Sequence, residues 1–128
     1  MRILIDTHIF LWLINNNPRL PNRKRQIIYD LNNEIFLSVV SMWECIIKYQ
    51  VGKLNFPTSP VTYLQQERKK HLIKTLIVNE ESISELLKLP LIHKDPFDRL
   101  IIAQSLQHDL TIMTEDKSIL AYRGVLFL

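Results

Sequence analysis

Short apolar runs without polar alternation recur along this chain and limit the folds it can adopt. They lie at residues 3–5, 35–40, 75–78, 110–114 and 125–128. A strand that is apolar at consecutive positions is buried on both faces, as in a parallel sheet covered by helices. Segments with helical periodicity separate these runs. The chain is therefore predicted to fold as an α/β protein with a mostly parallel sheet between helices.

The predicted helices fill the intervals between the strands. Trp43, Ile46 and Ile47 have the spacing of an amphipathic helix, and Gly52 is placed to cap its end. Other helices are expected at residues 21–31, 61–70 and 82–89, and from near residues 8, 96 and 117. The order of elements alternates strands with helices, and at 128 residues the chain has the length of one domain.

Composition excludes several classes of protein. The 2 glycines exclude glycine-rich phosphate loops, and the 1 cysteine excludes an internal disulfide and a multi-cysteine zinc site. No apolar run reaches the ~18 residues that span a bilayer, and the first residues do not form a signal peptide. We therefore expect a cytoplasmic protein that does not associate with membranes. A net charge of +3 permits a nucleic-acid partner without requiring one.

Four carboxylates fall where this fold brings residues together. Asp6 and Asp116 follow predicted strands, and Glu44 and Asp98 lie at predicted helix starts that face the same edge. Active sites of parallel sheets lie beyond the carboxyl ends of the strands. We therefore expect the four side chains to converge in one crevice.

Each carboxylate also has an ordinary structural role. Ser41 and Glu44 match a capping box, in which the glutamate bonds back to the serine backbone. Asp95 is placed as the N-cap of the last long helix, and the helix macrodipole favours Asp98 in its first turn. The other two aspartates could cap the helices that follow them. Capping explains each residue singly, whereas the gathering of four on one edge favours a functional site.

Crowded carboxylates need a cation. Two like charges ~4 Å apart, at an effective dielectric constant of ~20, repel by about 4 kcal/mol. Oxygen ligands suit hard divalent cations, so Mg²⁺ or Mn²⁺ is expected. Such an ion activates a water molecule, which suits hydrolysis of a phosphodiester. The polyanion would be held by basic residues, each of which could otherwise belong to a solvated helix face: Arg19, Arg23, Lys24, Arg25, Lys69, Lys70 and Lys74.

Four segments resemble the motifs of PIN-domain ribonucleases of the VapC toxin type. They are residues 4–12 around Asp6, 38–54 around Glu44, 93–104 around Asp98, and 110–116 ending at Asp116. They follow one another in order over nearly the whole chain. The departures are mild: Cys45 stands where an aliphatic residue is usual, and residues 69–75 lack a glycine that often precedes the third strand.

The resemblance implies a single three-layer α/β/α domain over residues 1–128 and a metal-dependent endoribonuclease. The implied ligands of Mg²⁺ or Mn²⁺ are Asp6, Glu44, Asp98 and Asp116. Thr7 and Thr114 would orient these carboxylates through their hydroxyls, and Asp95 would be a helix cap first and a site residue second. The resemblance also implies the toxin of a toxin–antitoxin pair, with an RNA substrate, a small VapB-like antitoxin and a homodimeric assembly.

Other functions are weighed against this interpretation. A non-catalytic module that binds RNA or protein with the same fold stays open as an alternative. A haloacid-type phosphatase needs an acidic residue where His8 stands, and a receiver-like signalling domain needs an acidic pair after the first strand. His8 and His93 lie near the acidic edge and could contact substrate, but surface or capping roles are favoured for both. Cys45 is expected to be a small buried hydrophobic residue and not a nucleophile.

Overall fold

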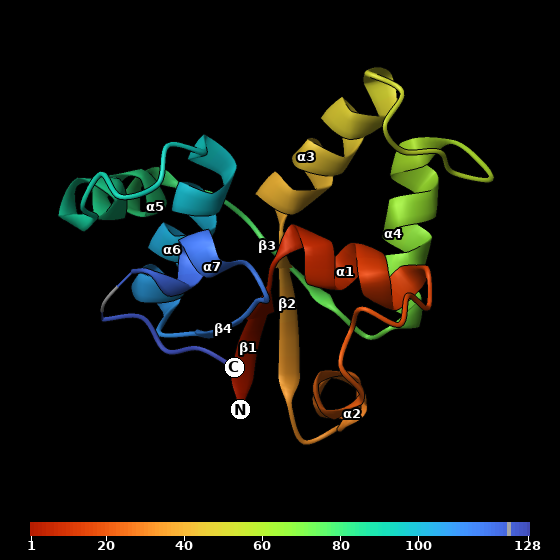
Figure 1. The fold of residues 1–128 in the computed structure, drawn as a ribbon, viewed down its shortest axis with the longest axis horizontal. Coiled ribbons are helices and arrows are strands. Elements are labelled where there is room, and N and C mark those ends of the chain that lie inside the picture. Colours follow the sequence, from red (N-terminus) through yellow and green to blue (C-terminus); the bar gives the residue numbers. More distant parts are fainter. Residues whose placement is uncertain (123) are drawn as a thin grey trace.

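One sheet of parallel strands organises the chain, in the order β3-β2-β1-β4 (Figure 1). The computed structural model describes residues 1–122 and 124–128, and the elements below are those of the described residues. The strands are β1 (Arg2–Ile5), β2 (Glu34–Ser38), β3 (Lys74–Leu76) and β4 (Thr111–Met113). The helices are α1 (Thr7–Ile14), α2 (Asn22–Tyr29), α3 (Val39–Gln50), α4 (Pro60–Lys70), α5 (Glu80–Glu85), α6 (Pro96–His108) and α7 (Lys117–Leu120), with a 3₁₀ turn, η1, at Leu86–Lys88.

The central strand β1 is buried on both faces. Ile3 and Ile5 pack into a core cluster shared with α1, α2, α3 and α4. Leu4 points to the opposite face, where it packs with residues of α6 and α7. Adjacent side chains of a strand alternate between the two faces of the sheet, so a consecutive apolar run requires helices on both sides. The prediction of a three-layer α/β/α fold is confirmed (Figure 1).

The register of the sheet sets where the site lies. Ile5 pairs with Leu37 on one side and with Met113 on the other. The residues that follow these three positions therefore leave the sheet at the same edge. The backbone N–H of Asp6 extends this pairing by donating to the Met113 carbonyl at 3.2 Å. This edge collects Asp6, Ser38 and Thr114.

Helix α3 begins earlier than predicted, which changes the position of Glu44 in it. Its N-cap is Ser38, whose Oγ accepts a hydrogen bond from the Val40 N–H at 3.1 Å. Glu44 consequently lies in the second turn, and the capping box predicted for Ser41 and Glu44 is wrong. The helix ends before Gly52, whose φ of +80° suits the reversal after a helix C-terminus.

The predicted strand at residues 125–128 is reduced to an isolated parallel bridge between Phe127 and Ile112. The strand stays short because its neighbour β4 is itself short. The Leu128 carbonyl accepts a hydrogen bond from the Lys24 ammonium at 2.9 Å. In the described ranges, no helix combines the length and apolar character that a membrane crossing requires.

Candidate metal centre

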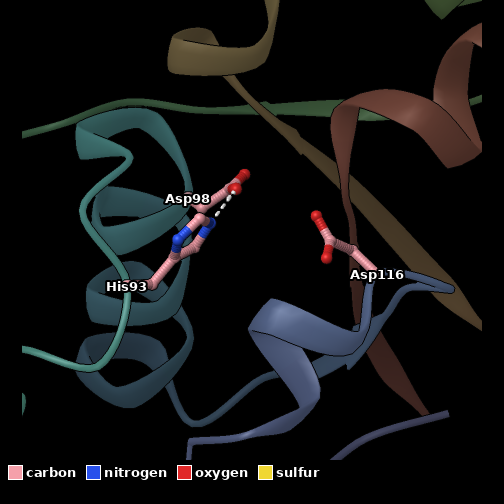
Figure 2. Close-up of side chains that lie close together, drawn as sticks. All are labelled: His93, Asp98 and Asp116. Atoms are coloured by element: carbon pink, nitrogen blue, oxygen red, sulfur yellow. Dashed lines mark hydrogen bonds and ion pairs between the residues drawn. The ribbon is translucent and has the colours of Figure 1, made fainter.

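Three side chains from the carboxyl edge of the sheet meet closely enough to share one ion. His93, Asp98 and Asp116 each offer one ligand atom, and these atoms lie within 4.8 Å of one another (Figure 2). Asp98 comes from the first turn of α6, and Asp116 is the N-cap of α7, accepting from the Ser118 N–H at 2.8 Å. Capping uses one oxygen of Asp116, so the cap and a ligand role are compatible in one residue.

Asp6 joins this cluster through Thr114. One oxygen of the buried Asp6 carboxylate accepts from the Ile9 N–H at 2.8 Å, which caps α1, and the other accepts from the Thr114 hydroxyl. The same hydroxyl oxygen accepts from the Asp116 N–H at 2.9 Å. Burial raises the pKa of Asp6, against the opposing effect of the two hydrogen bonds. Thr114 therefore links the Asp6 carboxylate to the backbone of Asp116.

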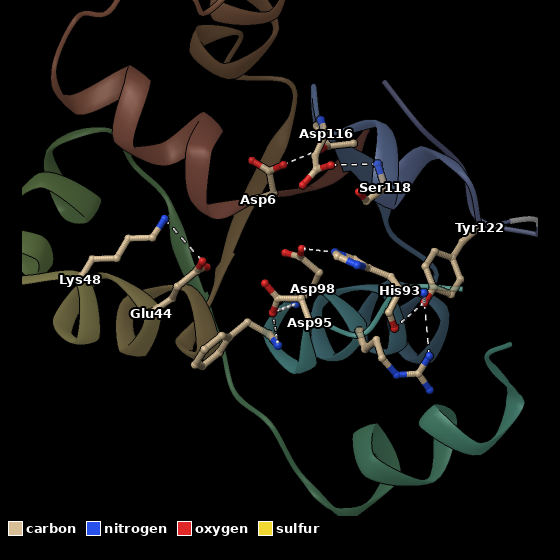
Figure 3. A network of polar contacts seen from close by, with 12 residues as sticks. Asp6, Glu44, Lys48, His93, Asp95, Asp98, Asp116, Ser118 and Tyr122 are labelled. Carbon is tan, nitrogen blue, oxygen red and sulfur yellow. Dashed lines mark hydrogen bonds and ion pairs between the residues drawn. The ribbon is translucent and has the colours of Figure 1, made fainter. Parts of the chain in front are cut away.

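Glu44 reaches the same region from α3 (Figure 3). Its Oε2 lies 3.6 Å from the Lys48 ammonium, while its Oε1 is buried without a hydrogen-bond partner among the described residues. A buried carboxylate oxygen without a partner is costly unless a cation or a donor meets it. Together with the aspartates, this oxygen fits a hard divalent cation. The carboxylate oxygens are therefore of the kind that Mg²⁺ or Mn²⁺ binds, while the ligand atoms that lie within 4.8 Å of one another belong to Asp98, Asp116 and His93 and not to Glu44 or Asp6.

The surroundings of Asp98 also shift its ionisation. Burial raises its pKa to about 6, the hydrogen bond from His93 opposes this rise, and the charges of Asp95 and Glu44 add to it. The His93 Nε2 lies 2.7 Å from Asp98 Oδ2. When carboxylates raise one another's pKa, either a proton or a metal ion can relieve the repulsion, so protons and metal ions compete for them.

In the metal-free protein, the unfavourable ionisation of Asp98 is expected to make the stability of the fold depend on pH. Because the pKa of Asp98 in the folded chain, about 6, exceeds its ordinary value of 3.8, stability from this group is present at low pH. That stability is lost as the pH rises through 6. With a chelator present, Asp98→Asn should therefore melt higher than wild type at pH 7.5 and close to it at pH 4. Calorimetric melts at both values test this, with the exposed Asp30→Asn as control. An equal difference at both pH values would contradict it.

The structure places the other predicted residues as follows. Asp95 is the N-cap of α6, accepting from the Phe97 N–H at 2.9 Å, and its charge acts on Asp98. The Thr7 hydroxyl donates to Ser41 Oγ at 2.8 Å and contacts α3, whereas Thr114 holds a carboxylate. The two threonines therefore differ in role, although the resemblance pairs them.

His93 lies in the site, whereas its sequence context favours a surface or capping role. Its backbone N–H donates to the Tyr122 hydroxyl at 3.0 Å, and Arg99 donates to the same oxygen at 3.2 Å. Arg99 also donates to the Pro90 carbonyl at 2.9 Å, so it holds the segment before α6 against that helix. One feature of the sequence could have identified His93 as a site residue. It lies just before Pro96, which begins α6, and the first turn of that helix carries Asp98.

Lys24 corrects the prediction that it belongs to the basic surface around the site. Its ammonium is buried and donates to the Thr114 carbonyl at 2.7 Å and to the Leu128 carbonyl at 2.9 Å. It also lies 3.0 Å from Glu115 Oε1. Lys24 cannot contact a polyanion in this position. It instead fixes the loop that carries Thr114 and Asp116.

Comparison with known proteins finds one family. The model of the PIN domain family matches residues 3–125. Ribonuclease VapC16 of Mycobacterium tuberculosis (strain ATCC 25618 / H37Rv) is 36% identical over 62 residues, which is 45% of this chain and 44% of that protein. The match thus spans less than half the length of this curated relative.

Solved structures agree with the fold over the whole chain. VapBC2 from Rickettsia felis, bound to a promoter DNA fragment, aligns with a TM-score of 0.76 at 16% identity, covering 100% of this chain and 98% of that one. VapBC-1 from nontypeable Haemophilus influenzae aligns with a TM-score of 0.69 at 17% identity, covering 100% and 97%. At these identities the likeness is one of fold.

Proposed function

The chain belongs to the PIN domain family, and from that premise we propose that it is a divalent-metal-dependent endoribonuclease that hydrolyses RNA phosphodiester bonds. The proposed ligands are Asp6, Glu44, Asp98 and Asp116. The observation that carries the proposal is the meeting of Asp98, Asp116 and His93 within 4.8 Å, beside a buried Asp6 that Thr114 connects to Asp116.

The side chains divide the work of the proposed reaction. Mg²⁺ or Mn²⁺, when bound, supplies an activated water and charge stabilisation at the phosphate. Asp98 and Asp116 present oxygens toward one point, and Thr114 keeps the Asp6 carboxylate and the Asp116 backbone in fixed relation. His93 holds the Asp98 carboxylate in one orientation through its Nε2. Fixed orientation of ligands by such partners strengthens metal binding.

RNA cleavage by the purified protein tests this proposal. With Mg²⁺ or Mn²⁺, we expect endonucleolytic cleavage of unstructured RNA, and we expect excess chelator to abolish it because the carboxylates then repel without a counter-ion. Product ends are resolved on denaturing gels, and titration calorimetry with Mn²⁺ measures the site directly. Cleavage that survives the chelator would show that another chemistry operates. RNA binding without cleavage at any metal concentration would favour the non-catalytic alternative.

The partner proposals follow from the named relatives. VapC16 is named a ribonuclease, and the similar solved structures are titled VapBC complexes. We propose by that likeness that this chain is the toxin of a toxin–antitoxin pair, with a small VapB-like antitoxin, a homodimeric assembly and a cytoplasmic site of action. This chain covers 98% and 97% of the matched chains in these structures, which supports a shared mode of assembly.

A further inference from the structure

A cavity of about 290 Å³ adjoins the metal centre on the side of α1. It is lined by His8, Trp12, Arg19, Glu115 and Asp116. Asp116 belongs to both the cavity and the metal centre, so the two share a wall. An RNA strand whose phosphodiester is bound at the carboxylates would therefore place its adjacent nucleotide at this cavity. The volume is just below the range of about 300–1,000 Å³ of small-molecule pockets.

One wall of the cavity is aromatic. His8 and Trp12 are four residues apart on α1 and so lie on the same side of the helix. Their ring centroids are 6.2 Å apart and their planes are inclined by 52°, so neither ring covers the face of the other. Trp12 is half-buried and packs against the core cluster, which fixes its ring in place. A fixed and partly exposed indole is a surface on which a planar base can stack.

The cavity is also lined by one cation, Arg19, and by one hydrogen-bond acceptor, Glu115. Arg19 is exposed, and among the described residues its guanidinium makes no ion pair or hydrogen bond, although its backbone N–H donates to Asn17. Glu115 is held by the buried ammonium of Lys24 at 3.0 Å. A carboxylate only accepts hydrogen bonds, so Glu115 favours a ligand that presents an amino group.

We propose that this cavity, the base pocket (His8, Trp12, Arg19 and Glu115), binds one nucleobase of single-stranded RNA beside the bond that is cut. The base stacks on Trp12, the adjoining phosphate contacts Arg19, and Glu115 accepts from an exocyclic amino group. Adenine, cytosine and guanine carry that group and uracil does not, so uracil is disfavoured. The proposal rests on the proposed function, because the substrate class is RNA.

Binding of labelled oligoribonucleotides in the presence of chelator tests the pocket without cleavage. Trp12→Leu is expected to weaken binding by about tenfold, within the roughly 5- to 150-fold range expected for loss of one stacked base. Arg19→Ala is expected to weaken binding and to lower the slope of log K against log salt by about one. The matched controls are Tyr29→Leu, an exposed aromatic residue outside the cavity, and Lys88→Ala, an exposed cation on η1 outside the cavity, and both should leave the affinity and the salt slope unchanged.

The outcomes separate the pocket from the proposed function. A folded Trp12→Leu protein that binds all oligonucleotides as wild type does would overturn the base pocket, even if RNA cleavage with Mg²⁺ is found. Loss of affinity in Trp12→Leu, in a protein that never cleaves RNA, would support the pocket and overturn the nuclease. If Trp12→Leu fails to fold, an oligonucleotide with one abasic position, bound to wild type and to Trp12→Phe, gives the same comparison. Equal affinity for abasic and intact RNA would overturn the pocket.

Discussion

An Asp98→Asn protein is expected to fold as wild type does and to lose at least about 100-fold of its metal-dependent RNA cleavage. Replacing ligand-orienting partners already costs about 10- to 100-fold, and Asp98 faces the proposed ion directly. Asparagine keeps the size of the side chain and can still hydrogen-bond His93, so the fold has no reason to change. Single-turnover kinetics measure the loss of RNA cleavage, and Mn²⁺ calorimetry measures the accompanying loss of metal affinity.

Asp6→Asn extends the same test to the buried carboxylate. Asparagine caps a helix about as well as aspartate, so the bond from the Ile9 N–H to this position is retained. The variant removes the charge and keeps the cap, and cleavage should again fall by about 100-fold or more. Asp30→Asn, which removes one exposed carboxylate elsewhere, is the control. Cleavage within tenfold of wild type in both site variants would show that neither carboxylate is needed as a metal ligand, which would leave Asp6 as a helix cap only.

Lys24→Met is expected to lower the free energy of unfolding by about 3 kcal/mol and the melting temperature by about 10 °C. Methionine fills similar space but cannot donate, so the carbonyls of Thr114 and Leu128 lose their partner in a buried position. Glu115 also loses its counter-charge, although it is partly exposed and regains water. Because the same loop carries Asp116, Mn²⁺ affinity should fall with stability.

Chemical denaturation and Mn²⁺ titration of four variants separate these effects. Arg23→Met, which removes an exposed cation one position earlier on α2, should match wild type in both measurements. The single variant Glu115→Gln and the double variant Lys24→Met/Glu115→Gln complete a double-mutant cycle, which gives the share due to the ion pair. If Lys24→Met melts within about 2 °C of wild type, its three contacts contribute little and the loop is held by its own backbone.

Much of the fold could be predicted because it depends on residues that are close together in the sequence. Ile3, Leu4 and Ile5 are consecutive and apolar, which only a strand covered on both faces accommodates. The carboxylates at strand ends followed from the same topology, since parallel strands end at one edge. The start of α3 did not follow, because Ser38 and Ser41 are both good caps. The pairing of Ser38 with Leu76 across the sheet, a long-range contact, extends β2 to Ser38 and allows Ser38 to cap α3.

The roles of Lys24 and His93 depend on contacts that are remote in sequence. The carbonyls that Lys24 binds are 90 and 104 residues away, and a lysine on a polar helix is ordinarily solvated. His93 is held by Tyr122, 29 residues further on. Neither partner is visible in local periodicity. Both residues position the loops around the carboxylates, and this is the part of the site that only the three-dimensional structure supplies.

The sheet order β3-β2-β1-β4 also determines when the site can form while the chain is being made. β1 is synthesised first, yet its Asp6 is completed by Thr114, 108 residues later. As they emerge from the ribosome, β2 can pair with β1 and β3 with β2, but the other edge of β1 stays open until β4 arrives. During most of translation the nascent chain therefore carries Asp6 and Glu44 without Asp98 and Asp116. A protein proposed to cut RNA is thus unable to attack its own messenger until β4 and its loop have been translated.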